Sequence, residues 1–379
     1  MSVYLDNAAT TKPCEPAVSA AFYCMVENYG NPSSLHRMGV EAEKVLTDTR
    51  KAIASALVCA PESVYFTSGA TESNNLAIMG ISEVYGRRRK KIVTTGIEHP
   101  SVAEPIKYLE EHGFEVVRIS PNRNGEIDYD EIIAAVDENT CFISCMLVNN
   151  ETGYILPIKR AFMAIKRNFP ECITHCDAVQ GFMKIPIKST ELYADLISVS
   201  AHKIHGIKGI GALFVKKGVR LSPIVRGGGQ EKALRSGTEG VPLIAGFGAA
   251  VRALHPNIGQ AVKNAEEINT YLRGRLSNLD GVTINSKADN CSPFILNVSI
   301  EGVRSEIMLH FLESKDIYVS SGSACSKGAK SSVLKSFGVS DKLIDNAIRI
   351  SISRETTWSD IDLLIAGIQE GQEKLSRAK

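Results

Sequence analysis

The 379-residue sequence lacks several features that would assign a protein to a broad class. Its longest apolar stretches, such as residues 241–251, are too short to span a bilayer and contain Gly and Pro. The first residues carry no basic region followed by an apolar segment, so we expect no secretory signal. The net charge is only +1, which gives no electrostatic reason to expect nucleic-acid, membrane or acidic partners.

The sequence also shows no sign of paired cysteines or of a nucleotide-binding loop. The nine cysteines are odd in number and scattered, so we expect no disulfide framework and a reducing, cytoplasmic location. No Gly-Lys dipeptide occurs, which excludes a Walker A loop. The glycines at 206, 209 and 211 have the wrong order for a dinucleotide fingerprint. There is no internal repeat.

Hydrophobic residues (44%) and charged residues (22%) are present at the levels of an ordinary globular protein, and the length favours two domains. Between 63 and 215, short apolar runs alternate with amphipathic stretches, which predicts an α/β fold with a mostly parallel, seven-stranded sheet. The candidate strands are 64–67, 92–95, 115–119, 142–148, 173–176, 196–200 and 212–215, and the candidate helices are 72–85, 102–112, 128–137 and 158–168.

The rhythm changes after about residue 241 and predicts a smaller α+β domain. Thr357 and Asp360 form a plausible N-cap for a final helix from Ser359. We expect a large domain over 14–250 and a small domain made of 1–13 and 251–379. The elements expected there are helices 243–254, 261–276 and 305–313, and strands near 282 and at 294–300, 317–319 and 347–353.

A lysine stands where α/β proteins place ligands. Lys203 follows strand 196–200 directly and precedes a glycine-rich turn. Lysine forms Schiff bases with carbonyl compounds when burial or nearby cations lower its pKa, and His202 and Lys208 could be such neighbours. The alternative is a solvated lysine in a tight turn, which is the commoner role for this residue type.

Two other strand ends carry polar residues of interest. Asp177 ends the strand that begins at Ile173, where a carboxylate could pair with a pyridinium nitrogen. A zinc site at Cys172, His175 and Cys176 is an alternative, but on a strand these side chains point to different faces. After strand 64–67, the segment 67–73 opens a helix and could hold an anion on its backbone N–H groups, although an ordinary N-cap has the same appearance.

A cysteine lies in a stretch of small residues in the second domain. Segment 320–328 reads Ser-Ser-Gly-Ser-Ala-Cys-Ser-Lys-Gly and predicts a flexible loop. Cys325 at its centre is therefore expected to be exposed, and Lys327 nearby favours some thiolate. Cys141 and Cys145, by contrast, fall in a predicted buried strand. An unreactive surface cysteine is the alternative reading of Cys325.

These elements together resemble the cysteine desulfurases of the class V aminotransferase superfamily, and the loop resembles that of the group I enzymes of nitrogenase and iron–sulfur assembly. The resemblance covers nearly the whole chain, and the joint order of its motifs carries it. Those motifs are Tyr4 to Thr10, Ser68 to Asn75, Glu98-His99, Asn149 to Gly153, Asp177 with Gln180, Ser200 to Lys203, Arg235 to Thr238 and Ser320 to Cys325.

The resemblance implies fold type I of the pyridoxal-phosphate (PLP) enzymes, PLP as cofactor, L-cysteine as substrate and no metal. It implies that Lys203 carries the cofactor and that Cys325 receives sulfur as a persulfide, for an acceptor in iron–sulfur cluster assembly or tRNA thiolation. It also implies a homodimer. The remaining roles fall to His99 on the ring face and in proton transfer, Asp177 at the pyridine nitrogen, Gln180 at the phenolic oxygen, Ala70, Thr71, Ser200, His202 and the second subunit's Thr238 at the phosphate, and Arg349, Asn150 and Asn31 near the substrate carboxylate.

Several departures leave the acceptor open. His205 and Ile207 replace the usual tyrosine and proline, so we expect a less rigid turn after Lys203. The stretch after Cys325 is unusually basic, and the sequence ends soon after the final helix. A selenocysteine lyase, another class V enzyme or a non-enzymatic scaffold remain alternatives. The basic run 87–91 could suggest RNA, but we expect a solvated helix end and no nucleic-acid binding.

Overall fold

The computed structural model describes residues 2–321 and 330–375, and the strands of these residues form three sheets. The largest has seven strands in the order β2-β8-β7-β6-β5-β3-β4. Its β8 runs antiparallel to both neighbours and the other pairs are parallel, which confirms the predicted mostly parallel sheet. The bounds are β2 Val64–Thr67, β3 Lys91–Thr95, β4 Glu115–Ile119, β5 Thr140–Met146, β6 Ile173–Asp177, β7 Leu196–Ser200 and β8 Gly211–Val215.

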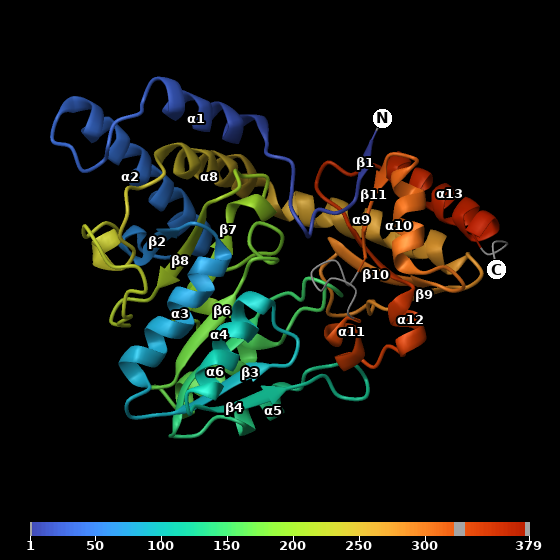
Figure 1. Ribbon diagram of the computed structural model, residues 1–379, viewed down its shortest axis with the longest axis horizontal. Helices are drawn as coiled ribbons and strands as arrows, with labels where there is room; N and C mark the ends of the chain where they lie inside the picture. Colours follow the sequence, from blue (N-terminus) through green and yellow to red (C-terminus); the bar gives the residue numbers. More distant parts are fainter. Residues whose placement is uncertain (1, 322–329, 376–379) are drawn as a thin grey trace.

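Helices cover this sheet (Figure 1). Their apolar faces form its core. Strands β5 to β8 are buried along their whole length, which explains their near-continuous apolar sequences. Helix α5 is shorter than expected because the Asp137 side chain accepts hydrogen bonds from Asn139 N and Thr140 Oγ1 and so starts the turn into β5. The helices are α3 Ala70–Tyr85, α4 Pro100–Glu111, α5 Tyr129–Ala134, α6 Ile158–Asn168 and α7 Ser189–Leu192, with a 3₁₀ turn η1 at Pro61–Ser63.

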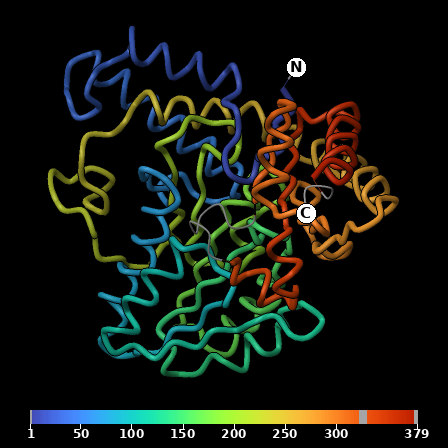
Figure 2. The backbone as a smooth tube through the Cα atoms, turned by 45° about the vertical axis from the view of Figure 1, so that its right-hand side comes forward, coloured from blue at the N-terminus to red at the C-terminus, as the bar shows by residue number. Residues whose placement is uncertain are grey.

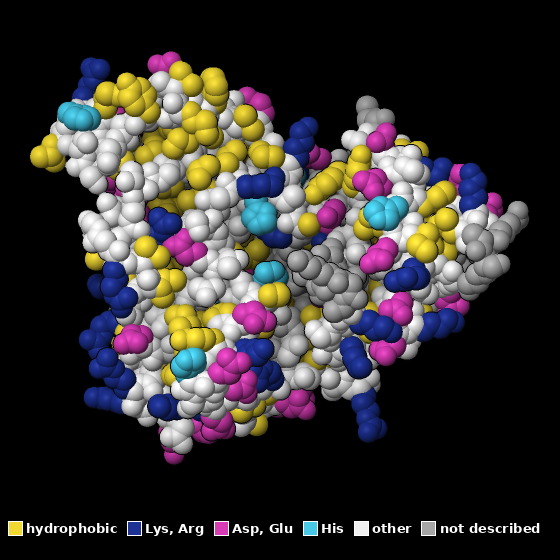
Figure 3. Space-filling model, in the orientation of Figure 1, with side chains coloured by type: hydrophobic (Ala, Val, Ile, Leu, Met, Phe, Trp, Pro, Cys, Tyr) yellow, Lys and Arg dark blue, Asp and Glu magenta, His cyan; other side chains and the backbone are white. Residues whose placement is uncertain are grey.

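Two helices near the N-terminus were not predicted. Helix α1 (Glu15–Val26) and helix α2 (Arg37–Leu57) pack on α8 (Val241–Leu254). The sequence of helix α1 shows no helical alternation of apolar and polar residues, because its outer face is apolar as well as its buried face. Those exposed apolar side chains gather over this helix in Figure 3: Val18, Phe22, Tyr23, Met25 and Val26.

A second, four-stranded sheet has the order β12-β13-β10-β9. Strand β1 pairs in parallel with β11, and the blue N-terminal segment accordingly lies beside the C-terminal elements in Figure 2. The bounds are β1 Val3–Tyr4, β9 Val282–Ile284, β10 Ile295–Ile300, β11 Ile317–Tyr318, β12 Ser320–Ser321 and β13 Ala347–Ser351.

Helices pack around this second sheet; those at 258–277, 305–313 and 358–375 were predicted, and two short ones at 332–336 and 341–345 were not. Helix α13 begins with the expected cap, since Thr357 N donates to Asp360 Oδ2 at 2.8 Å and Asp360 N donates back to Thr357 Oγ1 at 3.3 Å. The helices are α9 Ile258–Ser277, α10 Ser305–Glu313, α11 Ser332–Ser336, α12 Asp341–Asp345 and α13 Trp358–Leu375, and the short 3₁₀ turns are η2 Ala201–Lys203, η3 Glu231–Ala233 and η4 His255–Asn257. Among the described residues, no helix is long and apolar enough to cross a membrane.

Candidate active site

A cleft of about 790 Å³ lies between the carboxyl ends of the large-sheet strands and the second sheet. Both parts of the fold contribute to its walls, so residues distant in sequence meet there. The predicted site residues that line it are Ala70, Thr71, His99, Asn150, Asp177, Gln180, Ser200, His202, Lys203 and Arg349.

Lys203 lies in η2, directly after β7, and reaches back to the N-terminal segment. Its Nζ donates to Ala8 O at 2.6 Å and to Ala9 O at 2.7 Å. That segment is fixed by Thr11, whose backbone N and Oγ1 both donate to His202 O. These two carbonyl groups help to hold the amine at the cleft wall.

The expected less rigid turn after Lys203 is not what the contacts indicate. His205 is buried, its backbone N donates to Thr11 Oγ1 at 2.6 Å, and its Nδ1 lies 2.9 Å from Lys12 O. Burial lowers the pKa of the His205 imidazole, so the neutral ring can donate to that carbonyl. Hydrogen bonds thus fix the turn at His205, which stands where the family pattern has a tyrosine.

Asp177 ends β6 and is buried within a set of amide and hydroxyl groups. Its Oδ2 accepts from Asn74 Nδ2 at 2.9 Å, and its Oδ1 accepts from Val179 N at 3.0 Å. The Asn74 amide also donates to Ser101 Oγ at 2.9 Å, and Ser101 Oγ lies 2.8 Å from His99 Nδ1. One chain of hydrogen bonds therefore links the carboxylate to the histidine.

His99 is the N-cap of α4, and its Nδ1 accepts from Ser101 N at 3.1 Å. Burial lowers the pKa of this imidazole, the positive charge of Lys203 lowers it further, and Asp177 opposes the shift. A neutral ring whose Nδ1 accepts carries its proton on Nε2. His99 is thereby held in one tautomer at the cleft wall.

The residue before it, Glu98, also lines the cleft and is fully buried. Its Oε1 accepts from Thr95 Oγ1 at 2.5 Å and from Met146 N at 2.9 Å. Within the described residues, its Oε2 is buried without a hydrogen-bond partner. Burial, with a smaller contribution from the Asp177 charge, raises the pKa of the Glu98 carboxyl to about 8, so it is mainly protonated at neutral pH.

An anion site is formed where α3 begins beside β7. Gly69 is the N-cap, with Ala70 and Thr71 in the first turn, whose N–H groups have no acceptor within a helix. A Cβ at Gly211 would lie 2.7 Å from Gly69 C, so only glycine allows this approach of the two backbones. Ser200 Oγ, buried in the cleft wall, has no hydrogen-bond partner among the residues described.

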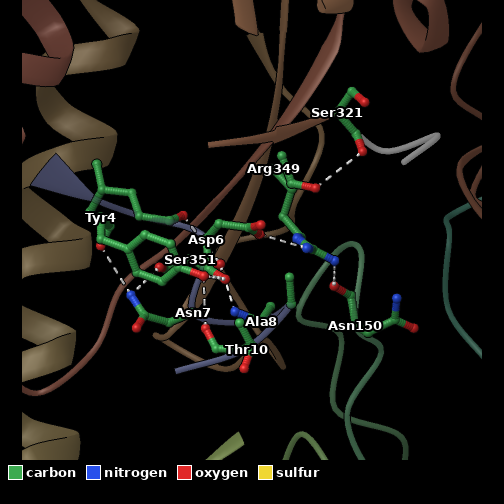
Figure 4. A network of polar contacts seen from close by, with 12 residues as sticks. Tyr4, Asp6, Asn7, Ala8, Thr10, Asn150, Ser321, Arg349 and Ser351 are labelled. Carbon is green, nitrogen blue, oxygen red and sulfur yellow. Dashed lines mark hydrogen bonds and ion pairs between the residues drawn. The ribbon is translucent and has the colours of Figure 1, made fainter. Parts of the chain in front are cut away.

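Arg349 on β13 brings a guanidinium to the same cleft (Figure 4). Its Nη2 pairs with Asp6 Oδ1 at 2.8 Å, and its Nη1 donates to Asn150 O at 3.0 Å. In the part of the chain that the structure describes, its buried Nε has no partner. A cation with spare donor capacity is suited to bind a carboxylate.

Two of the predicted site residues are absent from the described part of the cleft wall. Asn31 is exposed in the connection between α1 and α2 and is absent from the described residues of the cleft wall, so its place near this site stays a prediction. Thr238 is exposed and lines a neighbouring hollow beside Ser68. Cys325 lies outside the described residues.

The zinc alternative at the amino end of β6 is not supported by the geometry. His175 is buried with its Nδ1 2.8 Å from Ser144 Oγ and its Nε2 3.1 Å from Ser198 Oγ. Burial lowers the pKa of its imidazole to about 3. Among the residues that the structure describes, no group of three His, Cys, Asp or Glu side chains could hold a metal ion. His175 is a core residue.

The fold and the site define an α/β enzyme with a lysine at the centre of an anion-binding cleft. The model of the aminotransferase class-V family matches residues 3–364, and the chain belongs to this family.

Individual relatives agree with this assignment. The chain is 39% identical to a cysteine desulfurase IscS of Vibrio atlanticus, over 99% of this chain and 94% of the relative, and 36% identical to one of Methanosarcina thermophila, over 99% and 93%. A NifS-like protein of known structure superposes with a TM-score of 0.92 at 36% identity, over 98% of this chain and 99% of its own.

The family uses pyridoxal 5′-phosphate, and the cleft residues fit this group. The unpartnered Ser200 hydroxyl and the first turn of α3 suit its phosphate, and Asp177 suits a protonated pyridine nitrogen. His202 lines the same end, and burial, reinforced by Lys203, lowers the pKa of its imidazole to about 4, so it is neutral.

Sequence reasoning assigned no role to several residues that line the cleft or bond to the residues lining it. Asn74, Glu98 and Asp6 fall inside motifs that the resemblance quoted, so their place in the sequence could have pointed to them. Lys184 is different. It lies in a loop outside the quoted motifs, and its burial depends on tertiary packing that no local sequence pattern shows.

Proposed function

We propose that this protein is a PLP-dependent cysteine desulfurase that converts L-cysteine to L-alanine and transfers the sulfur to Cys325 as a persulfide. The observation that carries the proposal is the joint placement of Lys203, Asp177 and Arg349 in one cleft, in a chain related to cysteine desulfurases over its whole length. A lysine amine, a buried carboxylate and a guanidinium provide, respectively, cofactor attachment, control of the ring charge and binding of an α-carboxylate.

The bound cofactor supplies an electron sink that makes the substrate α-proton acidic. Arg349 binds the substrate carboxylate, and Asn150 borders the same position. Lys203 Nζ, held at the cleft wall, carries the proton away from the α-carbon. His99 carries its proton on Nε2, and this N–H is its donor on the side of the cleft where the cofactor ring would lie.

Sulfur transfer needs a nucleophile separate from these residues. The Cys325 thiolate attacks the substrate sulfur, a new S–S bond forms, and the C–S bond breaks with its electrons passing to carbon. Protonation of that carbon gives alanine, and the sulfur remains on Cys325 as a persulfide. An acceptor protein then removes it, and iron–sulfur assembly and tRNA thiolation are the candidate destinations. The described cysteines are all free thiols, which supports a reducing compartment such as the cytoplasm.

We further propose a homodimer with shared sites. Thr238 and Asn31, which the family resemblance assigns to the site, both lie outside the cleft of their own chain, as expected if they serve the second subunit. We also propose a large domain over 14–250 and a small domain of 1–13 and 251–379. The seven-stranded sheet falls within the first range and the four-stranded sheet within the second.

The experiment compares wild type with Cys325→Ser and with Cys59→Ser, which removes a partly buried thiol whose pKa burial raises to about 11. With L-cysteine and a thiol reductant, wild type and Cys59→Ser should form alanine at equal rates. Cys325→Ser should bind PLP and respond spectrally to cysteine, but form no alanine, because a serine hydroxyl is far less ionised than a thiol. Alanine formation at the wild-type rate by Cys325→Ser would exclude the persulfide role.

A further inference from the structure

The turn after β6 holds a lysine that the proposed reaction does not use. Lys184 is only 7% exposed, although lysine side chains are rarely buried unless they are paired. Its Nζ donates a hydrogen bond to Gln180 Oε1 at 3.0 Å. Gln180 is itself buried and lines the cleft. The lysine therefore contacts the site through this glutamine.

The backbone places these two side chains together. Gly181 N donates to Ala178 O at 2.9 Å, and Lys184 N donates to Gly181 O at 3.0 Å, so two turns follow each other. Met183 between them has a left-handed φ of 60°, a backbone conformation that residues other than glycine rarely adopt. The contact between Lys184 and Gln180 is thus built into the turn.

The glutamine amide can have only one favourable orientation in this setting. Its Nε2 donates to Ala8 O at 2.9 Å while its Oε1 accepts from Lys184. A flipped amide would place its oxygen against the Ala8 carbonyl and its nitrogen against the lysine amine, so both hydrogen bonds would be lost. A primary amide nitrogen has two N–H donors. One N–H of Gln180 Nε2 donates to Ala8 O, and the fixed amide keeps the second N–H as a donor for another acceptor.

We propose that Lys184 is a positioning residue that holds Gln180 as a hydrogen-bond donor toward the phenolic oxygen of the cofactor. This rests on the proposed function, which places PLP in the cleft. Donation to the phenolic oxygen draws negative charge from it and weakens its attraction for the proton on the neighbouring nitrogen of the Lys203 linkage. The visible absorbance of the bound cofactor reports the pH at which that proton leaves.

Other charged groups lie close to Lys184, so their electrostatic effect on the cofactor must be distinguished from the effect of the Lys184–Gln180 hydrogen bond. Lys184, Lys203 and His205 line one small cavity of about 20 Å³. Burial, reinforced by the charges of Lys203 and Arg349, lowers the pKa of the Lys184 amine to about 7. Lys184 in turn contributes to the lowered imidazole pKa of His202 and His205. Loss of the Lys184 charge alone could therefore shift the pH midpoint of the cofactor absorbance.

A double-mutant cycle distinguishes the two routes, with the PLP-bound protein as sample. The absorbance midpoint is measured against pH for wild type, Lys184→Met, Gln180→Ala and the double variant. Lys184→Met should raise the midpoint by about 0.5–1 pH unit and weaken PLP binding in titrations of the apoprotein. The same change in the Gln180→Ala background should have less than half that effect, because the residue through which it acts is gone.

Equal shifts in both backgrounds, or no shift in either, would overturn the inference. Lys208→Met, which removes an exposed lysine at the cleft wall, controls for charge alone and should shift the midpoint equally with and without Gln180. Lys184→Gln, which retains an N–H donor, should lie closer to wild type than Lys184→Met and serves if the methionine variant does not fold. A wild-type protein without cofactor absorbance would instead refute the proposed function.

Discussion

Glu98→Gln tests the electrostatics of the cleft through stability. Burial raises the pKa of this carboxyl from 4.5 to about 8. Below pH 4.5 both the folded and unfolded states hold the proton, and Glu98 makes its full contribution. Between pH 4.5 and 8 only the unfolded chain releases the proton, so stability falls as pH rises, by up to about 1.4 kcal/mol per pH unit. Over the whole window the loss is roughly 5 kcal/mol.

Glutamine has nearly the same shape as protonated glutamate and does not titrate. Its Oε1 can accept the same two hydrogen bonds, from Thr95 and Met146. The stability of Glu98→Gln relative to wild type should therefore increase steadily from pH 5 to pH 8 in urea unfolding at a fixed PLP concentration. Glu104→Gln, on the exposed side of α4, should show no such trend. Parallel stability curves for Glu98→Gln and wild type would refute a buried, protonated Glu98.

Three further variants test single contacts. Lys203→Ala should abolish the borohydride-reducible attachment of PLP to the protein, and mass spectrometry that still finds cofactor fixed to the variant chain would contradict the assignment. Glu231→Gln should lower the free energy of unfolding by about 3 kcal/mol in urea, because Arg50 loses a buried ionic partner; an unchanged midpoint would show that the pair is not stabilising. Arg349→Lys should raise KM for L-cysteine about 10-fold or more, since lysine lacks the planar set of donors, and an unchanged KM would exclude carboxylate binding at this position.

The sequence predicts the large sheet well because its signals are local. Strands β2, β4 and β7 have the expected bounds, since each is a short apolar run between turn residues. Helix α2 could also have been found, because its buried positions Ala42, Leu46, Ile53 and Leu57 lie near helical spacing. Helix α1 could not, because an apolar outer face removes the periodic contrast.

The site was predictable only in part. Lys203 and Asp177 stand at strand ends, where chain position and chemistry coincide. The Asp177–Asn74–Ser101–His99 chain of contacts is not visible in the sequence, because its members come from β6, α3 and α4. Burial that depends on tertiary packing, as at Lys184 and Glu98, has no local signature at all.

The N-terminal segment has a consequence for biosynthesis. Asn7 Nδ2 donates to Ser351 O at 2.9 Å, a contact between residues 344 positions apart in the chain, and β1 pairs with β11. The same segment supplies the two carbonyl groups that hold the Lys203 amine. During translation the first residues must therefore wait without their partners until β13 has left the ribosome. Contacts of such sequence separation form late. The reactive lysine can acquire its final setting only after β13 has been made, which keeps a shorter nascent chain from presenting a finished site.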